Sequence, residues 1–289
     1  MVAPSTSALL TQWNWAPSVV LGILLMGGAY IYAAGPLCRR HGWQGPTRAQ
    51  LTWFALSDVV LVIALLSPLD AISDQYLFSA HMVQHLLLAI VWPPLVLMAL
   101  TPWMVRSIFR SGIIAPFVSF LTYPAVALVL FNIDVYLWHI PAMYNATLQH
   151  ENVHILEHVT FMFFGLLNWW PLLSPLRELR LSYPFQILYL FLDGMFMMVL
   201  GIVFTFSPVV FYSAYSSAPR LWGLSALTDQ QIGGLVMWYP GNLPYAVLLA
   251  VAFYRWFDGG DEFHETDLAS PSQSPTINSP RPEVSNQEA

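Results

Sequence analysis

Charged residues are scarce in this chain. Asp, Glu, Lys and Arg together make up 9% of its 289 residues, whereas soluble domains carry roughly 25%. Hydrophobic residues make up 57% of the chain and aromatic residues 15%. This composition excludes an ordinary soluble domain and predicts an integral membrane protein surrounded by a lipid bilayer, with no nucleic-acid partner.

Cysteine is nearly absent and lysine is missing. Cys38 is the single cysteine, which excludes both a disulfide within the chain and a CxxC pair. Every basic residue is an arginine, and none precedes Arg39. The chain therefore lacks the positively charged start of a cleaved signal peptide, and its first apolar run is expected to remain as a helix.

Long apolar runs dominate the rest of the sequence. A membrane-spanning helix needs about 20 largely apolar residues, and these runs lack the alternation of a β-strand. Backbone groups in lipid must be hydrogen-bonded within the protein, which favours helices. We therefore predict an all-α integral membrane bundle of about seven transmembrane helices, over residues 17–34, 51–67, 82–100, 113–134, 153–173, 184–206 and 231–257.

The arginines lie almost entirely in alternate connections between these runs. Eight of the ten arginines fit this pattern, and Arg220 alone lies in an opposite connection; the eight are Arg39, Arg40, Arg48, Arg106, Arg110, Arg177, Arg180 and Arg255. Cytoplasmic connections carry the excess of basic residues, so we predict that the N-terminus lies outside and the C-terminus in the cytoplasm. Residues 1–257 are expected to form the membrane domain. Residues 258–289, rich in Ser, Pro, Asn and acids, are predicted to be a disordered cytoplasmic tail.

Six of the eight histidines fall near the predicted outer face. They are His81, His85, His139, His150, His154 and His158. Two pairs, one in each of two predicted helices, have the i,i+4 spacing that places side chains on one helix face. Imidazole is the commonest side-chain metal ligand, so the pairs predict a shared metal site. The same spacing is also compatible with haem ligation, with a hydrogen-bonded cluster or with interfacial histidines.

Acidic residues near the histidines are candidates for a supporting role. Glu157 and Asp134 could fix the tautomers of ligating histidines, although Asp134 is equally compatible with a solvated loop. Asp58 and Asp193 fall several turns into apolar runs, where a carboxyl group must be protonated or paired. Met195 and Met198 share a helix face and are soft ligands suited to Cu(I). Methionine is also a common core filler.

The sequence resembles a known family in three motifs. The stretches "HMVQHLLL…WPPLVL", "WHIPAMYNATLQHENVHILEHVTFMFFGLLNWWP" and "DQQIGGLVMW" are similar to those of the polytopic CtaG-type assembly factors of caa-type cytochrome c oxidases. The resemblance covers about residues 81–238. Its histidine motifs correspond to the six histidines named above, together with Glu157 and the run that begins at Asp229.

The resemblance implies a multi-pass protein of the plasma membrane, which is the inner membrane of a Gram-negative cell. Such a protein would be needed for an active haem-copper oxidase, through copper delivery to an oxidase subunit. Copper is therefore the expected cofactor, with His81, His85, His154 and His158 as ligands and His139 and His150 as alternates. A haem-binding electron carrier and a metal-free assembly scaffold remain open. No serine lies in a recognisable nucleophile motif, so enzymatic activity is not expected.

Overall fold

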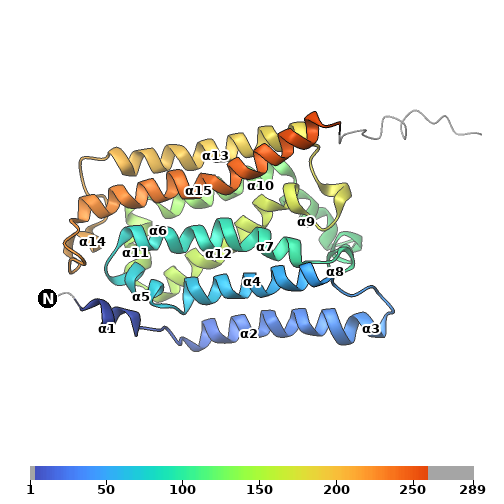
Figure 1. The fold of residues 1–289 in the computed structure, drawn as a ribbon, viewed down its shortest axis with the longest axis horizontal. Helices are drawn as coiled ribbons and strands as arrows, with labels where there is room; N and C mark the ends of the chain where they lie inside the picture. Colours follow the sequence, from blue (N-terminus) through green and yellow to red (C-terminus); the bar gives the residue numbers. More distant parts are fainter. Residues whose placement is uncertain (1–3, 260–289) are drawn as a thin grey trace, which may run out of the picture.

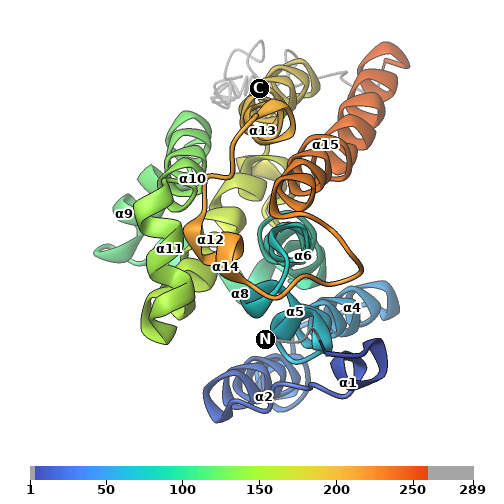
Figure 2. The same cartoon turned by 90° about the vertical axis from the view of Figure 1, so that its left-hand side faces the viewer.

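The computed structural model describes residues 4–259, and within that range it contains helices and no strand. The long helices run side by side along the longest axis of the molecule (Figure 1) and are seen end-on in Figure 2. The short helices α1, α5 and α14 lie at one end of this bundle, and α3 and α8 lie at the other. The tail predicted to be disordered falls outside the described residues, apart from its first two positions.

The helices follow one another with short connections. They are α1 (Thr6–Leu10), α2 (Pro17–Tyr32), α3 (Cys38–Arg40), α4 (Arg48–Leu65), α5 (Pro68–Gln75), α6 (Phe78–Leu86), α7 (Trp92–Ala99), α8 (Pro102–Arg106), α9 (Ile114–Leu121), α10 (Pro124–Trp138), α11 (Pro141–Gln149), α12 (Glu151–Leu173), α13 (Tyr183–Phe206), α14 (Ser213–Ser217) and α15 (Ala226–Phe257). A π-helical turn, Leu87–Val91, joins α6 to α7, so that Phe78–Ala99 is one continuous helix.

Six of the seven predicted runs coincide with these helices, and one prediction is wrong. The run over 113–134 is not a single helix, because the chain breaks between α9 and α10. Pro124 disfavours a helical conformation in the residue before it, and Tyr123 is accordingly extended, with φ −62° and ψ 129°. Pro124 then begins a new helix, which continues to Trp138.

Five helices are long and apolar enough to cross a membrane, and the number rises to seven if each of two bent helix pairs is one span. The central helix α12 is not among them, although it has 23 residues. Glu157, His158 and Asn168 lower its mean hydropathy. Its outward face nevertheless carries the exposed apolar side chains of Ile155, Val159 and Phe163. The polar residues of α12 are thus turned toward the bundle, as expected of a helix in lipid.

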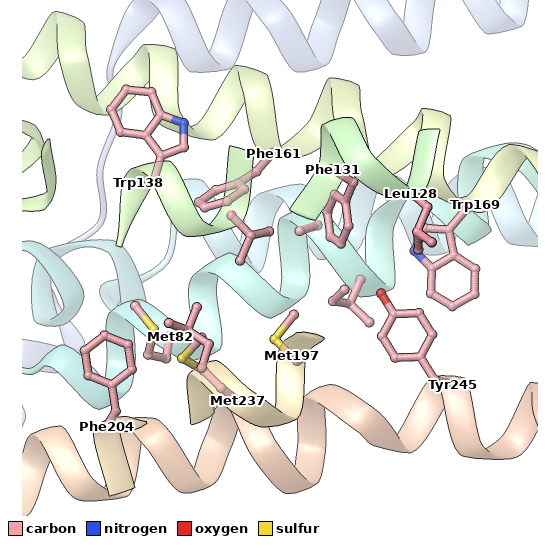
Figure 3. Close-up of a cluster of buried hydrophobic side chains, with 14 of the residues drawn as sticks. Met82, Leu128, Phe131, Trp138, Phe161, Trp169, Met197, Phe204, Met237 and Tyr245 are labelled. Carbon is pink, nitrogen blue, oxygen red and sulfur yellow. The ribbon is translucent and has the colours of Figure 1, made fainter. Parts of the chain in front are cut away.

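The apolar core fills the space between α6, α10, α12, α13 and α15. Figure 3 shows part of it, with Phe131, Phe161 and Trp169 on one side and Met197, Met237 and Phe204 on the other. Large apolar side chains are also exposed along outer helices, for example Leu24, Phe185 and Val247. Exposed apolar surface on this scale fits a lipid environment.

The arginine-bearing α3 and α8 and the C-terminal end of α15 lie at the same end of the bundle (Figure 1). These arginine-bearing segments, which the sequence predicts to lie on one side of the membrane, are therefore at one end of the bundle. The side of the membrane that each end faces stays a prediction.

Helices α13 and α15 approach each other most closely at two glycines. A Cβ atom on Gly201 would lie 2.9 Å from the carbonyl oxygen of Gly234, and one on Gly234 would lie 2.6 Å from Oγ1 of Thr205. Small residues permit such close backbone contact between helices in membranes.

We therefore expect Gly234→Ala to lower the free energy of unfolding by about 1–3 kcal/mol, because the added methyl group forces the two backbones apart. Thermal unfolding of the detergent-purified protein measures this change. The control is Gly22→Ala on α2, where an added Cβ meets no atom of the described chain within 4 Å. Equal unfolding temperatures for the two variants would contradict the close contact.

Candidate metal centre

Four histidines from two helices meet toward the end of the bundle that carries α5 and α14. His81 and His85 lie in the first turns of α6, and His154 and His158 lie in the first turns of α12. The ring centroids of His81 and His154 are 5.3 Å apart, and those of His85 and His158 are 5.8 Å apart. The structure thus brings the two predicted histidine pairs to one place.

Glu157 lies among these four rings. Its side chain is completely buried, with Oε2 3.7 Å from Nε2 of His81 and Oε1 3.6 Å from Nε2 of His85. Both distances exceed the usual hydrogen-bond range of about 2.7–3.2 Å. One ligand atom from each of His81, His154, Glu157 and His158 lies within 4.8 Å of the others. The sequence predicts a supporting role for Glu157, whereas the geometry makes it a candidate ligand.

Several buried atoms of this cluster lack a hydrogen-bond partner among residues 4–259. They are Nε2 of His81, His154 and His158, both ring nitrogens of His85 and both carboxylate oxygens of Glu157. An unsatisfied buried polar group costs about 1–3 kcal/mol, and more when it is charged. A cation between these nitrogen and oxygen atoms would satisfy several of them at once. The donor set fits a metal ion that accepts imidazole and carboxylate ligands.

Hydrogen bonds outside the cluster set the tautomer of His81. The hydroxyl group of Tyr215 donates to the carbonyl oxygen of Ser73 at 2.6 Å, and it lies 3.0 Å from Nδ1 of His81. Because the Tyr215 proton is already committed, Nδ1 of His81 is the donor in the second contact. In the neutral ring, Nε2 of His81 is then unprotonated and faces the carboxylate of Glu157. A cation between these two atoms would pair with both of them.

Helix α5 places two carboxylates beside the cluster. Oδ2 of Asp74 lies 3.5 Å from Nδ1 of His154, and Oδ1 of Asp70 accepts a hydrogen bond of 2.9 Å from Gln84. Burial raises the pKa of Asp74 to about 7, and the charge of Asp70 contributes to that rise. Burial also raises the pKa of Asp70. These acids put negative charge on the approach to the cluster at neutral and higher pH.

The sequence analysis missed the role of α5 and of Tyr215. Ser67 and Pro68 form a recognisable helix start, which could have revealed α5 and the i,i+4 spacing of its two aspartates. Tyr215 lies 134 positions from His81 in the sequence, and no local pattern connects them.

The two predicted alternate ligands lie outside the group formed by His81, His154, Glu157 and His158. His139 ends α10, with its ring centroid 6.1 Å from that of His85. His150 precedes the first turn of α12 and is exposed. Met195 is also exposed, at 41% of its surface, and Met198 is partly buried, so the structure does not place either beside the histidines.

The four aspartates with a predicted supporting role lie in different parts of the bundle. Asp134 is buried and accepts a hydrogen bond of 3.0 Å from Nε1 of Trp138. Asp58 is partly buried on α4. Asp193 lies deep in the bundle, where Asn132 and Asn168 each donate to its carboxylate.

Asp229 supports the site by holding the start of α6. Its carboxylate accepts hydrogen bonds from the backbone N–H groups of Phe78 and Ser79, at 2.7 and 3.1 Å, and from the Ser79 hydroxyl group. The first N–H groups of a helix have no partner within it, so this contact from α15 caps α6. The cap fixes the turn that carries His81.

The comparisons with known proteins agree with this architecture. The family described as "Cytochrome c oxidase caa3 assembly factor (Caa3_CtaG)" matches residues 28–258, which include the whole cluster. The chain belongs to this family. The resemblance seen in the sequence motifs is therefore confirmed, and the family name denotes assembly of an oxidase rather than catalysis.

Relatives of this chain occur in mycobacteria. Uncharacterized proteins of Mycobacterium bovis and Mycobacterium tuberculosis are each 26% identical to it over 272 residues, and one of Mycobacterium leprae is 22% identical over 270 residues. The matches cover 88% of this chain, but the chain spans only 40% of the length of these relatives. No solved structure matches the chain.

We expect Asp229→Ala to destabilise the protein by about 1–3 kcal/mol, because two N–H groups at the start of α6 lose their buried acceptor. The measurement is thermal unfolding in detergent. Asp258→Ala, which removes an exposed carboxylate after the last helix, is the matched control and should unfold like the wild type. The capping role fails if both variants behave alike.

Proposed function

We propose that this assembly factor binds a copper ion in the cluster of His81, His154, Glu157 and His158 and delivers it to the copper centre of a cytochrome c oxidase. The observation that carries the proposal is the set of buried, unsatisfied imidazole and carboxylate atoms within 4.8 Å of one another. Membership of the oxidase assembly family supports copper as the ion, because a haem-copper oxidase must be supplied with it.

The ligand chemistry supports copper over other divalent ions. Imidazole and carboxylate bind several transition metals, and affinity for a given site rises toward Cu²⁺ in the first-row series. Delivery is then an exchange of ligands in which histidines of an oxidase subunit compete for the ion, so no catalytic residue is needed. The cluster lies in the first turns of α6 and α12, near one end of the bundle. This position supports the proposal that the ion is held near a membrane surface, where a partner subunit can approach.

The geometry favours an ion over haem as the cofactor. The cavity beside His85 and His139 measures about 20 Å³, which is room for one water molecule or one ion. A macrocycle would require the helices to separate. The cluster is proposed to face the outside of the plasma membrane, in agreement with the arginine distribution.

Copper content tests the proposal directly. In protein loaded with Cu²⁺ in air, we expect about one copper ion per chain, and its loss in a Glu157→Gln/His158→Ala variant, because a ligand set of four cannot lose two members and hold the ion. Elemental analysis after dialysis, combined with an absorption spectrum, gives the copper content and reveals any haem.

The matched control is His150→Ala, which removes an exposed histidine of the same helix end and should keep its copper. Wild-type protein that is well folded, that has been exposed to copper and that holds no metal would contradict copper binding. The protein would then act in oxidase assembly as a scaffold that binds no metal.

Acidification should weaken copper binding. A proton and the metal ion compete for the same ring nitrogens, whose ordinary pKa is about 6.5. The affinity measured against a competing chelator should therefore fall as the pH is lowered from about 8 to about 5. An affinity that stays constant over that range would contradict ligation by imidazole.

A further inference from the structure

A small cavity adjoins His85, whose ring forms part of its lining. Its volume is about 20 Å³, and its lining includes His85, His139, Met82, Met197 and Met237. The three methionines come from three different helices, α6, α13 and α15. Figure 3 shows their sulfur-bearing side chains gathered between these helices. All three are at least 94% buried.

The ring of His139 presents a lone pair to this cavity. Nδ1 of His139 lies 2.6 Å from the carbonyl oxygen of Val135, which can only accept a hydrogen bond. Nδ1 therefore carries the proton, and in the neutral ring Nε2 is unprotonated. That Nε2 atom lies 3.4 Å from Sδ of Met82. A thioether has no proton to donate, so two buried lone-pair donors face each other.

The distance between these two atoms suits a shared ion. Metal bonds of about 2.0 Å to nitrogen and about 2.3 Å to sulfur, set at a tetrahedral angle, place the two ligand atoms roughly 3.5 Å apart. Thioether and imidazole are soft and neutral ligands, and such sets select Cu(I) over harder ions.

We propose that Met82 and His139, with Met197 and Met237, form a second metal site that takes Cu(I) or the equally soft Ag(I). It is distinct from the cluster around Glu157, whose ligands are nitrogen and oxygen atoms. This proposal rests on the proposed function only in taking copper as the ion that the site binds in the cell. The ion enters as Cu(I), so the proposal includes no redox step.

His85 connects the two sites. Its ring lines the cavity, and its Nε2 atom also lies 3.6 Å from Oε1 of Glu157. Neither of its ring nitrogens has a hydrogen-bond partner within the described part of the chain. An ion can therefore exchange between the sites through one imidazole. A cation in an apolar pocket needs a nearby compensating charge, and the buried carboxylate of Glu157 supplies it.

X-ray absorption spectroscopy of the full-length protein tests the second site. The protein carries Cys38→Ser, so that no thiolate contributes, and is loaded without oxygen with one equivalent of Cu(I). We expect sulfur scattering at about 2.3 Å from copper, which disappears in Met82→Leu/Met197→Leu/Met237→Leu. Ag(I) binding should weaken by at least the roughly 10–100-fold typical of a damaged metal site.

The control variant is Met195→Leu/Met198→Leu, which removes two methionines outside the cavity and should keep the sulfur signal. Exchange of Met for Leu nearly conserves volume, and His139→Gln provides a second test that retains every sulfur atom. It should lower Ag(I) affinity as well. A first shell of nitrogen and oxygen alone in the wild type, or sulfur that persists in Met82→Leu/Met197→Leu/Met237→Leu, would overturn the proposal.

The two proposals fail separately. If the cluster does not bind copper, the wild type and His154→Ala/His158→Ala, which retains Glu157, will both still show sulfur scattering from the second site. If the second site does not exist, the wild type will keep its copper on nitrogen and oxygen ligands, and the methionine variants will bind it equally well.

Discussion

The carboxylate of Glu157 is the constraint on which this structure depends. It is completely buried. Neither of its oxygen atoms has a hydrogen-bond partner among residues 4–259. The nearby ring nitrogens of His81 and His85 lie beyond hydrogen-bonding distance. A buried charge must be paired or bind a cation to be tolerated. The surrounding contacts hold this arrangement in place: Tyr215 orients His81, Asp74 approaches His154, and Asp229 caps the helix that carries two of the rings.

Helix α12 carries this polar site inside a bundle that is otherwise apolar. Its lipid-side stripe of Ile155, Val159 and Phe163 is exposed, whereas Glu157 and His158 are buried against α6. Ionisable residues in membranes are costly and usually face the interior of a bundle. The reduced hydropathy of α12 therefore reflects the site it carries. Helices α13 and α15, in contrast, pack tightly through Gly201 and Gly234.

Much of this arrangement could be predicted from local patterns. Apolar runs located six helices, and the i,i+4 histidine pairs predicted a shared site, because both features depend on periodicity within one helix. The rotation of each helix about its axis could not be predicted. That rotation buries Met197 beside the cavity and exposes Met195, and it turns Glu157 toward the histidines. His139 and His150 are predicted as alternate ligands from their depth in the membrane. Depth alone does not determine the direction in which a side chain points.

The copper content of the oxidase itself tests the central claim most directly. Cells that lack the native protein are supplied with Glu157→Gln or with His150→Ala, and the oxidase is purified and its copper is measured per haem. The account predicts copper-deficient oxidase with Glu157→Gln and a full complement with His150→Ala. Fully copper-loaded oxidase with Glu157→Gln would contradict delivery from the cluster.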